Sequence, residues 1–299
     1  MATTVFHIEG GVGKHLAATA VIKAYKNAHP KRKIVVVSAF PEIFLKNKDV
    51  ARFYRIGAVP YFYEDYLLKK DVQIFAQDPY RQTSHITKQS HLIETWCNMV
   101  GVPYNNEPTN INFNFREKEI AGSIIDQNIP KNDKPLLIFQ PFGGPGKDHQ
   151  PHPYAWTRDI HPTTAQQIVD KLKDQYNILH VCYEFHPHLN DCLRLDRMFP
   201  KKELFGILPY STKRLLIDSS LQHAAASMNL PSTVVWVATN PELFGYPLHN
   251  NIFPVNSYPR GTVDSYLYDY SFTGIVHECP YDDITDIHDV DTIVKSVLD

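Results

Sequence analysis

The stretch Leu215-Leu216-Ile217-Asp218-Ser219-Ser220-Leu221-Gln222-His223-Ala224-Ala225-Ala226 indicates the fold class of this chain. An apolar run of strand length ends at Asp218, and a helix of small residues begins at once. Strands that are apolar on both faces are typical of parallel α/β sheets, whose ligands bind at the carboxyl ends of the strands. Ser219 or Ser220 can cap the helix, and the N–H groups of its first turn suit an anion such as phosphate. With His223 one turn further on, the stretch predicts either a phosphate site or an ordinary capped strand-to-helix turn.

The composition is that of a globular protein with room for two domains. The chain has 299 residues, of which 43% are apolar, and its mean hydropathy is -0.31. A formal net charge of -2 gives no broad electrostatic footprint for nucleic acid, although a local basic patch remains compatible with it. The N-terminus has no signal-peptide pattern, and no apolar run approaches the ~20 residues of a membrane span. We therefore expect a cytoplasmic protein without stable membrane insertion.

Cysteines and histidines do not form a metal-binding pattern. The scattered cysteines contain no C-x-x-C pair, which favours buried reduced thiols: Cys97, Cys182, Cys192 and Cys279. Prolines divide the clustered histidines into loops, and no H-E-x-x-H is present: His149, His152, His161, His186 and His188. No metal site is expected.

The first half of the chain opens with a βαβ unit. A strand at 5–8, a glycine-rich turn at 9–13, a helix at 16–28 and a strand at 33–37 follow one another, so the two strands should be parallel. Further strands are predicted at 58–63 and 72–76, and helices at 91–100 and 117–127. The Pro-Lys-Asn-Asp-Lys-Pro segment at 130–135 is the best candidate for a linker.

The same pattern then restarts. A strand at 136–139 leads into a glycine loop, and the chain continues with a helix at 163–174, strands at 178–182 and 233–237, and a terminal helix at 289–298. Two successive β/α halves predict an α/β protein with two Rossmann-like domains facing a cleft, over residues 1–130 and 131–299.

Two glycine loops are candidate ligand sites. The turn from Glu9 to His15 is similar to a phosphate-binding P-loop, but Ile8 stands where the pattern needs its first glycine, and His15 stands where it needs Ser or Thr. An NTPase is therefore disfavoured, and a glycine turn that faces a ligand is expected. The second loop, Gly143-Gly144-Pro145-Gly146-Lys147, offers backbone N–H groups and a lysine that suit a diphosphate, the alternative being a flexible surface loop.

Several segments together resemble the lipopolysaccharide heptosyltransferase family. The most specific block runs from Asp218-Ser219-Ser220-Leu221-Gln222-His223 through Leu230-Pro231-Ser232 to Thr239-Asn240-Pro241. The opening Gly-Val-Gly-Lys-His-Leu at 11–16 and the Gln-Pro-Phe-Gly-Gly at 140–144 stand where the family has its two other loops. The resemblance implies a two-domain GT-B glycosyltransferase that needs no metal and no cofactor beyond a nucleotide-diphospho-sugar co-substrate.

The resemblance also implies roles for particular residues. Asp218, Ser219, Ser220 and His223 would line the donor pocket, with Gly143, Gly144 and Lys147 facing the diphosphate from the other side. Gly11, Gly13 and Lys14 would form the loop on the acceptor side.

One departure from the family concerns catalysis. The family's general base is an Asp, and this chain has Lys14 in its place. A protonated lysine cannot accept the proton of an acceptor hydroxyl. Glu9, His15 and Asp78 are the candidates to replace that Asp, and Glu9 is favoured because it follows the first strand directly.

The sequence thus predicts a glycosyltransferase that moves a sugar from a nucleotide-diphospho-sugar to an acceptor hydroxyl, with inversion, without metal and with a glycan as acceptor. Two alternatives stay open. The acceptor is a hydroxymethylated base of viral DNA, contacted by basic residues of the first half, or the protein binds nucleotide sugars without catalysis.

Overall fold

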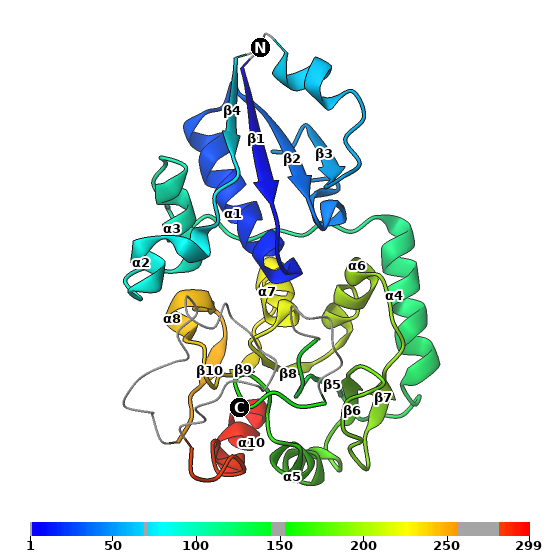
Figure 1. Cartoon of the computed structure of the whole chain (residues 1–299). Helices are drawn as coiled ribbons and strands as arrows, with labels where there is room; N and C mark the ends of the chain where they lie inside the picture. The colour runs from blue at the N-terminus through cyan, green and yellow to red at the C-terminus, as the bar shows by residue number, and fades with distance from the viewer. Residues whose placement is uncertain (1, 69–70, 145–152, 256–280) are drawn as a thin grey trace. The chain divides into compact units, whose positions relative to one another are not determined.

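The computed structural model describes residues 2–68, 71–144, 153–255 and 281–299 (Figure 1). The chain forms two compact units, residues 1–114 and 115–299. Each unit is built on a parallel sheet with helices, so the expected α/β class is confirmed. Within the ranges described, no helix is both long and apolar enough to cross a membrane.

The first unit contains a four-stranded parallel sheet in the order β3-β2-β1-β4. Its strands are β1 (Thr3–Ile8), β2 (Lys33–Ser38), β3 (Arg52–Arg55) and β4 (Val72–Phe75). Strands β1 and β2 pair in parallel, as the βαβ pattern predicted, and the helix between them is α1 (Val12–Ala28). Successive residues of β1 and β2 are buried, because both faces of the sheet are covered.

The remaining helical elements of the first unit are short. They are η1 (Pro41–Phe44), the π-helical turn η2 (Tyr63–Leu67), η3 (Pro79–Arg81), α2 (Thr83–Ile86) and α3 (Leu92–Met99), and α3 packs on α1. The strand predicted at 58–63 is wrong. Gly57, with φ of +81°, follows β3, and the aromatic residues that suggested a strand instead place Phe62 and Tyr66 against Tyr54 from a helical turn.

The second unit contains a six-stranded parallel sheet in the order β10-β9-β8-β5-β6-β7. Its strands are β5 (Leu136–Phe139), β6 (Asn177–Val181), β7 (Leu193–Leu195), β8 (Lys213–Ile217), β9 (Thr233–Val235) and β10 (Asn250–Ile252). The two edge strands, β7 and β10, have three residues each and were not predicted, because so short a run carries no periodicity.

Helices cover the second sheet. They are α4 (Phe115–Asn128), α5 (Pro162–Leu172), α6 (Lys201–Phe205), η4 (Leu208–Tyr210), α7 (Ser220–Ser227), α8 (Pro241–Phe244) and α10 (Val290–Leu298). Helices α5 and α10 lie side by side (Figure 1) and bury Ile168, Val169 and Ile293 against Leu137 and Leu215 of the sheet. Helix α7 packs beside β8, from which it directly follows.

Helix α4, which the sequence placed in the first domain, packs in the second unit. Glu117 of α4 pairs with the buried Lys202 of α6 at 2.8 Å, and Ala121 lies close to Gly206. The division between the units therefore falls before α4, whereas the predicted boundary followed it at residue 130.

In both sheets the strand order reverses at one point. The first chain segment runs outward from β1 to β2 and β3, and β4 then pairs on the other side of β1. In the second unit β6 and β7 lie on one side of β5, and β8 pairs on its other side. Such a reversal leaves a crevice at the carboxyl ends of the two strands, where open α/β sheets bind ligands.

Candidate functional site

Polar side chains meet at the reversal point of the second sheet. Gln140 follows β5 directly, and Asp218 and Ser219 follow β8. The hydroxyl of Ser219 donates to Oε1 of Gln140 at 2.5 Å and accepts from the backbone N–H of Leu221 at 3.3 Å. Ser219 is therefore the N-cap of α7, one of the two caps that the sequence allowed.

Asp218 lies beside this contact. Burial raises the pKa of its carboxyl, and the nearby Thr239 hydroxyl and Arg158 guanidinium oppose that shift. A carboxylate and a guanidinium are thus held at the same strand ends. Together with the start of α7, they offer both acceptors for sugar hydroxyls and positive charge for a phosphate.

The glycine loop after β5 is held by a buried carboxylate. Asp159 accepts from the N–H of Gly143 at 2.8 Å and from the N–H of Ala155 at 2.9 Å. Burial raises the pKa of Asp159, and the charge of Arg158, whose Nε lies 3.5 Å from the carboxylate, opposes the shift. The N–H of Gly143 is thus directed to Asp159, and Lys147 of the predicted loop lies outside the described residues.

Arg158 explains why glycine stands at position 143. A Cβ there would lie 2.1 Å from the guanidinium, whose Nη2 donates to the carbonyl of Gly144 at 2.9 Å. Neither Arg158 nor Gln140 was predicted as a site residue. Gln140 stood inside the quoted loop motif, but Arg158 carries no spacing signal, because the fold of residues 153–160 alone brings it back to the glycines.

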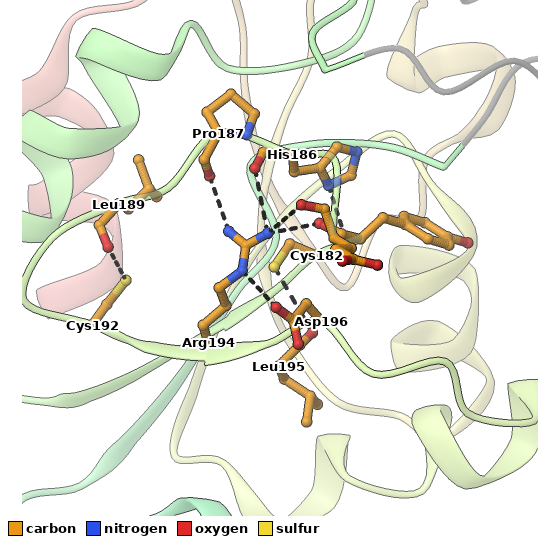
Figure 2. A network of polar contacts seen from close by, with 10 residues as sticks. Cys182, His186, Pro187, Leu189, Cys192, Arg194, Leu195 and Asp196 are labelled. Atoms are coloured by element: carbon orange, nitrogen blue, oxygen red, sulfur yellow. Dashed lines mark hydrogen bonds and ion pairs between the residues drawn. The ribbon is translucent and has the colours of Figure 1, made fainter.

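Arg194 holds the loop after β6 through a network of polar contacts (Figure 2). Its guanidinium donates to the carbonyls of Tyr183 and Glu184 at 2.9 Å each, and Nε pairs with Asp196 at 2.8 Å. Tyr183 is thereby held where its hydroxyl would lie 3.3 Å from a Cβ at Gly144. Its ring stacks on Phe185 at a centroid distance of 5.3 Å, so the loop presents an aromatic surface beside the candidate site.

His223 stands one turn into α7, as expected, but is buried. Its Nδ1 lies 2.8 Å from the hydroxyl of Tyr246, and its neighbour Gln222 donates to the carbonyl of Phe244 at 3.2 Å. His249 in turn reaches the carbonyl of Gln222 at 3.1 Å. These contacts tie α7 to residues 244–249 and so fix the direction in which the helix start points.

Of the thiols that the structure describes, Cys97 and Cys182 are buried, as the sequence indicated, and Cys192 is half-buried. Cys97, Cys182 and Cys192 are free, and burial raises their pKa values to about 12, 12 and 11. Over the described ranges, no three His, Cys, Asp or Glu side chains are grouped as metal ligands. Cys279, His149 and His152 lie outside those ranges.

The reversal point of the first sheet holds an ion pair. Nζ of Lys14 lies 2.8 Å from Oδ1 of Asp78, which also accepts from the N–H of Tyr80 at 3.0 Å and so caps η3. Lys14 is 6% exposed, and its ammonium faces the rings of Tyr80 and Trp96 at 5.0 and 5.8 Å. Of the predicted loop, Gly11 is the N-cap of α1, whereas Gly13 lies inside the helix with Lys14.

The three candidate bases have different environments. Glu9 is 73% exposed, and its carboxylate lies 3.4 Å from Nε2 of His7. His15 is fully buried, with ring nitrogens 2.9 Å from the carbonyl of Gly11 and 3.2 Å from that of Ile8, and burial lowers its pKa to about 4. Both ring nitrogens of His15 thus face backbone carbonyls. Asp78 is half-exposed and fixed by Lys14.

Solved structures of glycosyltransferases are similar to this chain in fold. No protein-family model and no curated protein matches the sequence. A family 9 glycosyl transferase from Veillonella parvula is similar in structure, with a TM-score of 0.71 at 13% identity over 99% of this chain and 95% of that one. E. coli ADP-heptose lipopolysaccharide heptosyltransferase II gives a TM-score of 0.62 at 11% identity over 100% and 99% of the two chains.

A third similar structure is TibC from enterotoxigenic E. coli, a dodecameric, iron-containing glycosyltransferase. Its TM-score is 0.70 at 12% identity, over 99% of this chain and 77% of that one. These matches span nearly the whole chain at very low identity, so they show a shared fold. The resemblance that the sequence indicated is confirmed at that level: the chain has the fold of the heptosyltransferase-type glycosyltransferases.

Proposed function

We propose that this protein is an inverting, metal-independent glycosyltransferase that moves a sugar from a nucleotide-diphospho-sugar to a hydroxyl of a glycan. The observation that supports this proposal most directly is the hydrogen bond between Ser219 and Gln140 at the reversal point of the second sheet. That contact joins polar groups and a helix start at the carboxyl ends of neighbouring strands, and the binding of nucleotides at such ends of α/β sheets supports the proposal. The fold shared with heptosyltransferases supports the same reading.

The second unit is the donor side in this proposal. Asp218, Ser219 and Ser220 contact the sugar and the diphosphate, and the N-terminal end of α7 stabilises the negative charge. Arg158, held by the carbonyl of Gly144, supplies a guanidinium for the phosphates. Lys147 stays a predicted diphosphate contact.

The first unit is the acceptor side, with the turn that contains Gly11 and the start of α1 at the carboxyl end of β1. The acceptor hydroxyl attacks the anomeric carbon on the face opposite the diphosphate, so the configuration inverts. The bond from the anomeric carbon to the phosphate oxygen breaks, and the nucleoside diphosphate leaves with the electron pair. Arg158 and the start of α7 stabilise the charge that develops there.

Similar structures suggest which donor to test first. TibC has been solved with ADP-D-β-D-heptose, and heptosyltransferase II is named for ADP-heptose. We infer that an ADP-sugar is the first candidate for this chain.

The test is a panel of ADP-, UDP- and GDP-sugars and the free diphosphates, read by thermal unfolding and by release of nucleoside diphosphate. We expect one nucleotide class to raise the Tm. We expect Arg158→Met to lose that shift, while Arg116→Met, at an exposed position of α4, keeps it. A panel without any binding would overturn the proposal, and binding without turnover on any glycan would favour the inactive alternative.

A further inference from the structure

The pair formed by Lys14 and Asp78 lies at the reversal point of the first sheet. Lys14 is in the first turn of α1, which follows β1, and Asp78 follows β4. Strands β1 and β4 are neighbours on opposite branches of the strand order, so the pair spans the place where this sheet would bind a ligand. The two residues are far apart in sequence, and only the topology brings them together.

The pair is asymmetric in exposure. The side chain of Lys14 is 5% exposed, whereas that of Asp78 is 41% exposed. The ammonium is enclosed by Tyr80, by Trp96 and by Gly10, where a Cβ would lie 3.5 Å from Cδ of Lys14. Gly10 has φ of +93°, a conformation that glycine adopts without strain. The ammonium of Lys14 is thus buried, whereas the carboxylate of Asp78 is partly exposed to solvent.

Asp78 is held through one of its oxygens. Both the bond from Lys14 and the bond from the N–H of Tyr80 end on Oδ1. Over the described part of the chain, Oδ2 of this half-exposed carboxylate has no such bond and is the oxygen that can accept a proton. Glu9, by comparison, carries a largely exposed side chain whose carboxylate lies 3.4 Å from Nε2 of His7, and His15 is turned toward backbone carbonyls.

We propose that Asp78 is the general base of the transfer, and that Lys14 is the positioning residue that orients it. This inference rests on the proposed glycosyltransferase function. Oδ2 of Asp78 accepts the proton of the acceptor hydroxyl while that oxygen forms its bond to the anomeric carbon. The bond between the anomeric carbon and the phosphate oxygen breaks, and the nucleoside diphosphate departs. A lysine at position 14 is then compatible with catalysis, because the carboxylate comes from β4 instead of from α1.

The first test is Asp78→Asn. Asparagine keeps an oxygen that can cap η3 and accept from Lys14, but it cannot take up the proton. The probe is ADP-heptose, or the donor that the panel identifies, and the readout is release of nucleoside diphosphate, for which water serves as a slow acceptor. We expect kcat to fall on the order of 10²–10⁴-fold with donor Kd unchanged. Asp71→Asn, at an exposed carboxylate of the same unit, is the matched control and keeps full kcat.

Variants of Lys14 test whether its ion pair with Asp78 orients that carboxylate for catalysis or only stabilises the fold. Lys14→Met leaves the fold without a buried charge, and Lys14→Arg keeps a cation that can pair with Asp78. We expect Lys14→Met to lower kcat while the KM for the donor changes little. Lys14→Arg should recover part of the lost kcat. The double variant Lys14→Met/Asp78→Asn removes charge and partner together, so its Tm should recover relative to Asp78→Asn while its kcat does not.

The results distinguish failure of the proposed role of Asp78 from failure of the proposed glycosyltransferase function. If the wild-type protein binds no nucleotide sugar, the proposed function fails. If the wild type turns over and Asp78→Asn keeps its kcat, or if the double variant regains kcat along with Tm, Asp78 is a structural residue and this inference is overturned. Loss of kcat in Glu9→Gln with none in Asp78→Asn would assign the base to Glu9.

Discussion

Ser219 and Gln140 are joined by a hydrogen bond that connects the ends of β8 and β5, the two strands between which the order of the second sheet reverses. The same serine caps α7. One hydroxyl thus both caps the helix and holds a polar side chain from the neighbouring strand. The proposed donor site depends on this coupling.

Replacement of Ser219 by Ala should therefore lower stability and donor binding together. Loss of an N-cap costs about 1 kcal/mol, and Oε1 of Gln140 loses its donor. Urea unfolding measures the first effect and nucleotide titration the second. Ser227→Ala, at the last residue of the same helix, is the control that should leave nucleotide affinity unchanged. Equal affinities for all three proteins would remove Ser219 from the donor site.

Replacement of Gly143 by Ala should lower the stability of the protein, although it adds only a methyl group. The added Cβ would lie 2.1 Å from the guanidinium of Arg158, so the arginine must move and lose its bond to Gly144. Overpacking of this kind costs about 1–3 kcal/mol, and the proposed phosphate contact is displaced with it. Gly11→Ala, where a Cβ meets nothing within 4 Å, should lower the Tm less, since it replaces a favoured N-cap residue but creates no clash. A Gly143→Ala protein with wild-type Tm would show that Arg158 can be relocated freely.

Stability should fall on mild acidification, because several histidines are buried in the neutral form. Burial lowers the pKa of His15 to about 4 from 6.5, so the unfolded chain binds a proton between these values and the folded one does not. The contribution of neutral His15 to the free energy of unfolding is complete above pH 6.5. It is lost as the pH falls toward 4, at up to about 1.4 kcal/mol per pH unit. His180 and His186, with pKa values lowered to about 3 and 4 by burial, act in the same direction.

The measurement is the free energy of unfolding in urea at pH 7 and at pH 5. We expect a clear loss at pH 5 for the wild type and a smaller loss for His15→Gln. A wild type equally stable at both pH values would mean that these rings are not buried in the neutral form.

Breaking the pair between Lys202 and Glu117 should detach α4 from the second unit. Lys202 is 3% exposed at its side chain, and a buried charge that has lost its partner costs about 3–5 kcal/mol. Glu117→Gln is therefore expected to lower the free energy of unfolding by an amount of this order, and Glu117→Leu/Lys202→Met to recover most of it. Lys171→Met, which removes an exposed pair with Asp291, should have no measurable effect. If Glu117→Gln behaves like Lys171→Met, α4 is held by its apolar side chains alone.

The sequence by itself determined the longer local elements of this protein, but not the three-residue strands β7 and β10. Apolar runs such as residues 215–217 form strands because both faces of each sheet are covered, and the Asp-Ser-Ser that follows must end the strand and start α7. These signals lie within a few residues of one another, so they can be read without the fold. The class, the parallel pairing of β1 with β2 and the resemblance to heptosyltransferases followed from them.

The tertiary structure alone decided which distant side chains meet. Nothing in the spacing of Lys14 and Asp78, or of Gly143 and Arg158, predicts contact, because each pair is joined by strand order and loop path rather than by helical or strand period. The sequence favoured Glu9 as base because it ends β1, but the reversal of strand order brings the end of β4 to the same place. The local sequence pattern therefore predicts the strands and where each one ends. The strand order determines which residues lie together at those ends.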